Sequence, residues 1–162
     1  MYKRPVSVLV LIFTPQHRVL LLERAAHPGY WQSVTGSQEA DDVSLRATAI
    51  REVWEETGID ATTPEHYLHD WQESQTWEIF PQWRHRYAPG VTQNTEHLFS
   101  LCLPAEQAIR LAAAEHRAYQ WLDYQTAAAK CFSPSNREAI LRLPDSLHCL
   151  AAPTFLANAD LA

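Results

Sequence analysis

The sequence predicts a mixed α/β fold, in which β-strands come both before and after one central helix. Its 162 residues are close to the roughly 150 expected for one domain. Hydrophobic residues make up 46% of the chain and aromatic residues 10%, enough to bury a sizeable core. No internal repeat, low-complexity tract or linker divides it. We therefore expect a single domain over residues 1–150 and a tail of uncertain order over residues 151–162.

The first half of the chain predicts a hairpin, a short strand and a helix. Two β-branched and apolar runs, residues 6–13 and 19–22, flank the segment TPQHR, which is typical of a hairpin. After a loop with a proline and a glycine, a short strand is expected over residues 31–36. The clearest helix covers residues 44–57, because side-chain oxygens suitable for an N-cap precede it and Gly58 suits its C-terminal end.

The second half predicts further strands and a last helix. Three strand-like stretches are expected at residues 67–71, 77–83 and 97–103, with a late strand at residues 118–122. The run Ser135-Asn136-Arg137-Glu138 has the pattern of a capping box and predicts a helix that continues to Leu143.

The charge balance excludes one class of function. The chain has 13 basic and 19 acidic residues, a net charge of −6, whereas a protein that binds nucleic-acid polymers usually needs a basic surface. A small anionic ligand, held by a local basic cluster or by a metal ion, remains possible.

The N-terminus and the cysteines predict a cytoplasmic protein. The apolar run at residues 6–13 is too short for a membrane span or for a signal peptide with its cleavage site, so we expect a buried strand. Cys102, Cys131 and Cys149 are widely spaced and form no CxxC pair. This spacing indicates neither a disulfide framework nor a zinc knuckle, and we expect three reduced thiols.

The end of the central helix carries three carboxylates. At about 100° per residue, Glu52, Glu55 and Glu56 fall on one side of the helix, nearly opposite the apolar Val53 and Trp54. Like charges at this spacing cost about 0.2–0.5 kcal/mol per pair, and acids near a helix C-terminus also face the negative end of its dipole. Mg²⁺ or Mn²⁺ would reverse both penalties. By themselves, the three glutamates are also compatible with a solvated acidic face.

The residues around these glutamates resemble the Nudix box. Its consensus is Gly, five residues, Glu, seven residues, then Arg-Glu-apolar-x-Glu-Glu-x-Gly-apolar. Residues 51–59 match the second half at every fixed position. In the first half Asp42 replaces the Glu that follows Gly36, and eight residues rather than seven precede Arg51. The resemblance implies a Nudix-type α/β/α sandwich with a mixed sheet, whose box helix carries metal-binding glutamates.

Segments outside the box resemble the dihydroneopterin triphosphate diphosphatase subfamily. They cover residues 2–7, 31–37, 84–90, 115–121 and 135–137. The resemblance implies a pyrophosphohydrolase of folate biosynthesis that converts dihydroneopterin triphosphate to dihydroneopterin monophosphate and pyrophosphate. A pyrophosphatase acting on dATP or an oxidised purine nucleotide is a second hypothesis. A non-catalytic nucleotide-binding module is a third, although this chain keeps all three box glutamates.

The resemblance also implies roles for the box residues. Glu52 and Glu56 are expected to bind Mg²⁺, with Mn²⁺ as a possible substitute, and Glu115 completes the metal site. Glu55 either joins the metal cluster or orients the attacking water, and Glu55 or Glu115 accepts the proton of that water. Arg51 is expected to hold the box carboxylates in place by pairing with them.

Substrate contacts are implied from several segments. Lys3 and Arg24 are expected to meet phosphates, and Arg84, His85 and Arg86 to offset polyphosphate charge. Trp77 and Phe80 could stack on a pterin or purine ring, while Glu78 pairs with its N–H groups. The remaining expected contacts are Thr35, Ile79 and Ser133. The only partner expected is a small-molecule triphosphate, with no nucleic-acid polymer, membrane or obligate protein partner.

Overall fold

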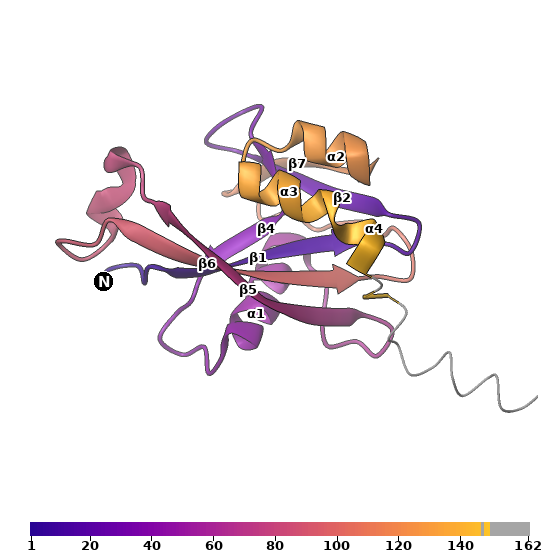
Figure 1. Cartoon of the computed structure of the whole chain (residues 1–162), viewed down its shortest axis with the longest axis horizontal. Helices are drawn as coiled ribbons and strands as arrows, with labels where there is room; N and C mark the ends of the chain where they lie inside the picture. Colours follow the sequence, from indigo (N-terminus) through magenta and orange to yellow (C-terminus); the bar gives the residue numbers. More distant parts are fainter. Residues whose placement is uncertain (147, 150–162) are drawn as a thin grey trace, which may run out of the picture.

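A computed structural model of the chain describes residues 1–146, 148 and 149, so the expected tail at 151–162 lies outside the described residues. A seven-stranded sheet runs through it (Figure 1). Its strands are β1 (Val6–Phe13), β2 (Arg18–Arg24), β3 (Trp31–Gln32), β4 (Val34–Ser37), β5 (Tyr67–Glu78), β6 (Gln93–Cys102) and β7 (His116–Asp123). The main order is β3-β2-β1-β6-β5, with β4 paired to β1 and β7 to β2. Only the β1–β6 pairing among these is parallel, so the sheet is mixed.

Helices cover both faces of the sheet. They are α1 (Leu45–Thr57) on one face, and α2 (Tyr124–Lys130), α3 (Pro134–Leu141) and α4 (Leu143–Ser146) on the other. Because successive side chains of a strand point to opposite faces, Val8 packs in one core with Val53 of α1. The next residue, Leu9, packs in a second core with Ile140 of α3. The expected α/β/α sandwich with a mixed sheet is confirmed.

The central helix begins and ends as the sequence predicts. Ser44 accepts a hydrogen bond from the backbone N–H of Ala47 at 3.0 Å, and Gly58 adopts a left-handed conformation with φ of 74°. The prediction of its buried face was wrong in one respect. Trp54 is 50% exposed, under the guanidinium of Arg110, whereas two of the box glutamates lie on the buried face. Helical spacing identified the carboxylate group but not the side that the sheet covers.

The stretch after α1 departs from the prediction. β5 is one long strand, with a pairing irregularity between Asp70 and Ser74, and it continues to Glu78. The expected strand at 77–83 is instead the end of β5 followed by the 3₁₀ helix η1 (Pro81–Arg86). Pro81 has no N–H for a strand ladder and fits the first turn of a helix.

In the last third of the chain, one helix was not predicted and another begins at a different residue from the one predicted. α2 was not predicted; it begins after Asp123, whose carboxylate caps the N–H of Thr126. The predicted final helix exists, but its N-cap is Ser133 rather than Ser135, with Pro134 in the first turn. It ends at Leu141, and α4 follows separately.

The expectation of three reduced thiols was wrong. Cys102 at the end of β6 forms a disulfide with Cys149, and their Cα atoms are 5.6 Å apart. The two cysteines are separated by 47 positions in the sequence, so only the fold brings them together. Cys131 is a buried free thiol.

Within residues 1–146 and 148–149, no helix has the length and apolar character needed to cross a membrane.

Candidate active site

The last turns of α1 place two carboxylates inside the protein. Glu52 is 8% exposed and Glu56 only 2% exposed. Glu52 lies directly over Gly36 of β4, where an added Cβ atom would overlap its carboxyl group. Gly36 is therefore needed for close packing, because any larger residue would displace the glutamate. The backbone N–H of Thr35, the residue before, donates to the Glu56 carboxylate.

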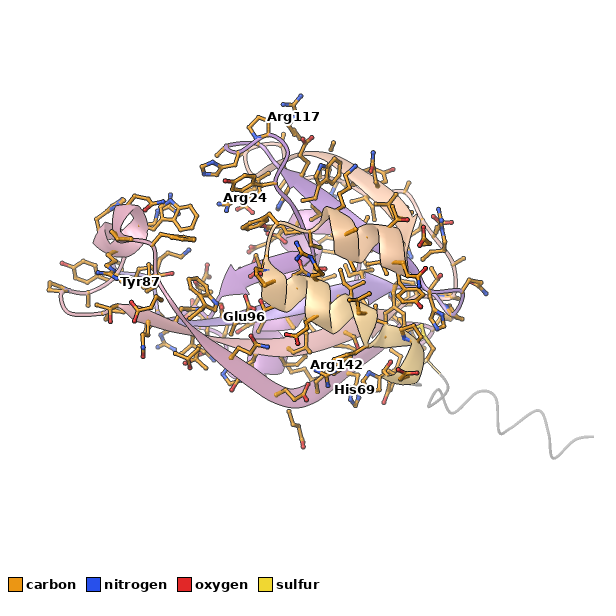
Figure 2. All side chains as sticks on the ribbon, turned by 45° about the horizontal axis from the view of Figure 1, so that its top comes forward. Arg24, His69, Tyr87, Glu96, Arg117 and Arg142 are labelled. Carbon is orange, nitrogen blue, oxygen red and sulfur yellow. A yellow bond between two sulfur atoms is a disulfide. The ribbon has the colours of Figure 1, made fainter. Side chains whose placement is uncertain are left out.

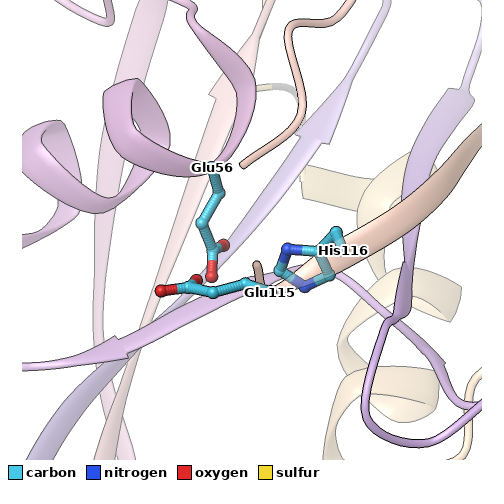
Figure 3. A group of neighbouring side chains, drawn as sticks. All are labelled: Glu56, Glu115 and His116. Atoms are coloured by element: carbon cyan, nitrogen blue, oxygen red, sulfur yellow. The ribbon is translucent and has the colours of Figure 1, made fainter. Parts of the chain in front are cut away.

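A third carboxylate and an imidazole complete a group of metal-ligating atoms (Figure 3). One such atom from each of Glu56, Glu115 and His116 lies within 4.8 Å of the other two. Among the described residues, Glu56 Oε2 and His116 Nδ1 have no hydrogen-bond partner although both are buried. Buried polar atoms without partners are costly, and a divalent cation would satisfy these. Carboxylate oxygens suit Mg²⁺ or Mn²⁺, so the residues present fit such an ion.

The pKa values of these carboxylates also indicate that they need a nearby cation. Burial raises the pKa of Glu52 to about 7, against the opposing charge and hydrogen bond of Arg51. Burial also raises the pKa of Glu56 well above its usual value, and the charges of Glu52 and Glu115 add to this effect. A nearby cation would favour the ionised forms.

Arg51 holds the first and second halves of the box together. Its Nε and Nη2 atoms donate to the two carboxylate oxygens of Asp42 at 3.0 and 2.8 Å. Its Nη1 donates to Glu52 at 2.9 Å and to the half-exposed Glu55 at 3.2 Å. The hydrogen bonds of Arg51 lower the pKa of Asp42 to about 2. The shorter acid and the additional residue in the box therefore leave this pairing intact.

Two basic side chains, Lys3 and Arg24, lie near the carboxylates, and Arg86 lies near both of them. The backbone N–H of Lys3 donates to the carbonyl of Arg86 at 2.9 Å, which joins the N-terminal segment to the end of η1. Desolvation of its ammonium group, followed by the charge of Arg86, lowers the pKa of Lys3. The same two causes lower the pKa of Arg24. The three cations thus repel one another, and a polyanion between them would relieve that repulsion.

Two expected substrate contacts are already used within the fold. The hydroxyl of Thr35 donates to the carbonyl of Val8 at 3.0 Å. Ser133 caps α3, and its hydroxyl lies 3.1 Å from that of Ser135. Their side chains serve the fold, so further contacts would use their remaining hydrogen-bonding capacity.

The expected ring-binding stretch is only partly accessible. Ile79 is 1% exposed, so its side chain is in the interior, whereas Phe80 is 53% exposed. Trp77 is half-buried. The Glu78 side chain is 66% exposed and pairs with Arg84 at 3.2 Å. The partner that a charge in this apolar stretch needs is thus present within the chain.

An aromatic row near these residues was not predicted. Trp83 contacts Phe80 and His27 edge-on, with ring centroids 5.3 and 6.1 Å apart, and Arg24 lies over its ring. The row continues through stacked rings from His27 to Tyr30 and from Tyr30 to Phe132. Its members come from two loops and from η1 with the residue before it, so no spacing in the sequence could have identified them. His116 was also not predicted as a metal ligand, although its position next to Glu115 in the sequence could have indicated that role.

The chain is similar to known proteins over most of its length. The NUDIX domain family matches residues 3–143. A dihydroneopterin triphosphate diphosphatase of Escherichia coli (strain K12) is 51% identical over 140 residues, which are 86% of this chain and 91% of that protein. The protein of that name from Haemophilus influenzae is 42% identical, with coverage of 86% and 87%.

Solved structures give the same result. The structure of the E. coli dihydroneopterin triphosphate pyrophosphohydrolase has a TM-score of 0.78 and 50% identity, and the match covers 86% of this chain and 94% of that one. A Nudix hydrolase structure from Listeria monocytogenes has a TM-score of 0.73 at 23% identity, which supports the fold alone.

Proposed function

Because the chain belongs to the Nudix family, we propose that it is a divalent-metal-dependent pyrophosphohydrolase of folate biosynthesis, which converts dihydroneopterin triphosphate to dihydroneopterin monophosphate and pyrophosphate. One observation carries the proposal: buried carboxylates with an unsatisfied oxygen lie beside mutually repelling cations. Such an arrangement suits a metal ion together with a polyphosphate. The relatives named for this activity, at 51% and 42% identity, support the choice of substrate.

The metal is proposed to be Mg²⁺, with Mn²⁺ as a substitute. Glu56 and Glu115 would hold it, with His116 as a further ligand from the same group of atoms. Glu52, one turn earlier on α1, is proposed as an additional ligand. When bound, the cation supplies a Lewis acid that neutralises phosphate charge. Arg51 touches no substrate in this scheme and acts by holding Glu52 in place.

The chain's own residues bind the substrate and move the proton. Lys3 and Arg24 bind the triphosphate oxygens and stabilise the charge that develops on them. Water attacks at phosphorus, and the anhydride between the α- and β-phosphoryl groups breaks. We assign the acceptor of the water's proton to the carboxylate oxygen of Glu115 that would not hold the cation, because Glu55 is held by Arg51.

The proposed location and partners of the protein follow from a small, charged substrate. We propose one Nudix domain over residues 1–150 that works in the cytoplasm on a small-molecule triphosphate. No nucleic-acid polymer, membrane or obligate protein partner enters the proposal, in keeping with a net charge of −6.

The test is a parallel kinetic comparison. Pyrophosphate release is measured with Mg²⁺ on dihydroneopterin triphosphate, dATP and dGTP, and we expect the highest kcat/KM with the pterin. A higher kcat/KM with dATP would instead identify a nucleoside triphosphate pyrophosphatase. Metal-dependent release from none of the three would identify a non-catalytic binding module.

A further inference from the structure

A cavity of about 340 Å³ lies between the β5–β6 pair and α3, on the sheet face opposite α1. Its apolar floor is Leu9 and Leu98. Near one end lies Glu96 of β6, and near the other the ion pair of Glu73 with Arg142 at 2.9 Å. In Figure 2, Glu96 lies between α3 and the segment that carries η1.

Glu96 has too few partners for a carboxylate in this position. Ser135 donates to it at 3.4 Å, a long hydrogen bond, and no basic side chain of the described residues forms an ion pair with it. Burial raises its pKa. The acid at the other end of the same cavity, Glu73, has an arginine partner. Glu96 is therefore an acceptor that still lacks a good donor.

A second acceptor lies two residues earlier on the same strand. Asn94 and Glu96 point to the same face of β6, because side chains alternate along a strand. Asn94 is 1% exposed, and its Nδ2 atom donates to Ser7 Oγ at 2.8 Å. Its Oδ1 atom has no partner among the described residues. Glu96 lines the cavity and Asn94 is buried next to it on the same face of β6, so a ligand edge with two donors that enters at Glu96 would match both acceptors.

The position of this pair fits a ligand whose phosphates lie at the α1 carboxylates. Ser7 of β1 pairs with Glu96 on one side and with Ser37 of β4 on the other, next to Gly36 under Glu52. Two strand spacings of about 4.8 Å therefore separate Glu96 from β4 within the sheet. Because Glu96 faces α3 and Glu52 faces α1, a ligand that reaches both must pass the edge of β4, which among the described residues pairs only with β1. Trp77, the strand partner of Asn94, adds an aromatic side chain.

We propose that Glu96, together with Asn94, recognises a ring edge on which an amino group and a ring N–H stand side by side, as in a 2-amino-4-oxopyrimidine. Pterins and guanine have this edge, whereas adenine presents one donor beside an acceptor. The inference rests on the proposed function, and it replaces the exposed Glu78 by Glu96 as the acid that selects the ring.

The experiment measures binding without turnover. Neopterin, GMP and AMP are titrated into the full chain without metal, and their dissociation constants are compared for the wild type and Glu96→Gln. The substitution replaces an acceptor oxygen by a donor, so we expect neopterin and GMP to bind about ten- to a hundredfold more weakly and AMP to be unchanged. Glu138→Gln, an exposed acid lining the same cavity, is the matched control and leaves all three constants unchanged.

Two results would overturn the inference: unchanged binding of neopterin, or equal weakening of all three ligands. If the glutamine variant does not fold, Glu96→Asp provides a second variant. Its shorter side chain keeps the negative charge but moves the carboxylate away from the ligand, and it weakens the binding of neopterin selectively. Failure of the proposed function would give a different result from failure of this inference. The chain would then release no pyrophosphate, but its binding of the ring would still depend on Glu96.

Discussion

The carboxylate end and the ring end of the candidate site are built differently. At the carboxylate end, Glu52 and Glu56 are buried in one helix, and Arg51 connects that helix to Asp42 through charge-assisted hydrogen bonds. At the proposed ring end, the aromatic row joins side chains from η1 and two loops, and the ion pair of Glu78 with Arg84 is exposed. A short local motif suffices for the first region, whereas the second depends on segments far apart in the sequence.

This difference indicates where substitutions will matter. Groups held rigidly around a buried charge tolerate little displacement, because each unpaired atom there carries its full desolvation penalty. Exposed pairs contribute little, since water replaces each lost partner. Variants at the carboxylate end should therefore reduce turnover strongly, and variants in the exposed part of the ring end should have small effects.

The largest effect is expected for Glu56→Gln. Loss of a buried metal ligand should lower Mg²⁺-dependent pyrophosphate release by roughly a hundred- to a thousandfold. The metal-free variant should melt at a higher temperature than the wild type, because the substitution removes a buried carboxylate one of whose oxygens has no partner. Glu65→Gln, an exposed acid, is the control. Turnover near the wild-type value would contradict the metal assignment.

Glu115→Gln separates catalysis from binding. If Glu115 accepts the proton, kcat should fall by about a hundredfold while KM changes little. Steady-state kinetics on dihydroneopterin triphosphate provide both constants. A change confined to thermal stability would return Glu115 to the status of an ordinary surface acid.

Gly36→Ala tests the close packing under Glu52. The added methyl group should displace the Glu52 carboxylate and weaken Mn²⁺ binding by about tenfold, measured by titration calorimetry. Gly29→Ala is the contrast: φ is +89° there and nothing lies within 4 Å of the added atom, so stability falls while Mn²⁺ affinity stays. Equal Mn²⁺ affinities in the two variants would show that Glu52 does not depend on Gly36.

The stability of the metal-free protein should fall as pH rises. Glu52 has a pKa of about 7 in the fold against an ordinary value of 4.5, so the folded state holds a proton that the unfolded state has lost between these values. The loss of stability caused by ionising the buried Glu52 is absent below pH 4.5 and complete above pH 7. Melting temperatures across this range should decline, and Glu52→Gln should reduce the decline to the part that comes from Glu56. A melting temperature that rises with pH over the same interval would contradict the assignment.

The smallest effect is expected for Glu78→Gln. Exposed ion pairs contribute about 0–1 kcal/mol, so the ratio of kcat/KM for the pterin substrate to that for dATP should change by less than about threefold. A larger change in this ratio would show that Glu78 leaves Arg84 to contact the ring.

The sequence by itself determined the parts of this protein that depend on local spacing. The strands of the first hairpin, the limits of α1 and the grouping of its glutamates follow from periodicity, capping residues and one short motif. Predictions from local sequence patterns failed where neighbouring residues and packing determined the structure. η1 replaced a predicted strand at Pro81, and Ser133 capped the last helix in place of Ser135.

Only the tertiary structure decided which faces and partners these elements have. Helical spacing cannot show that the carboxylates of α1 face the sheet while Trp54 faces solvent, because burial depends on what packs against the helix. The disulfide between Cys102 and Cys149 and the aromatic row join positions that are far apart in the sequence and that only the packing of the chain brings together. Contacts between distant segments depend on the packing of the whole chain, and no local pattern records them.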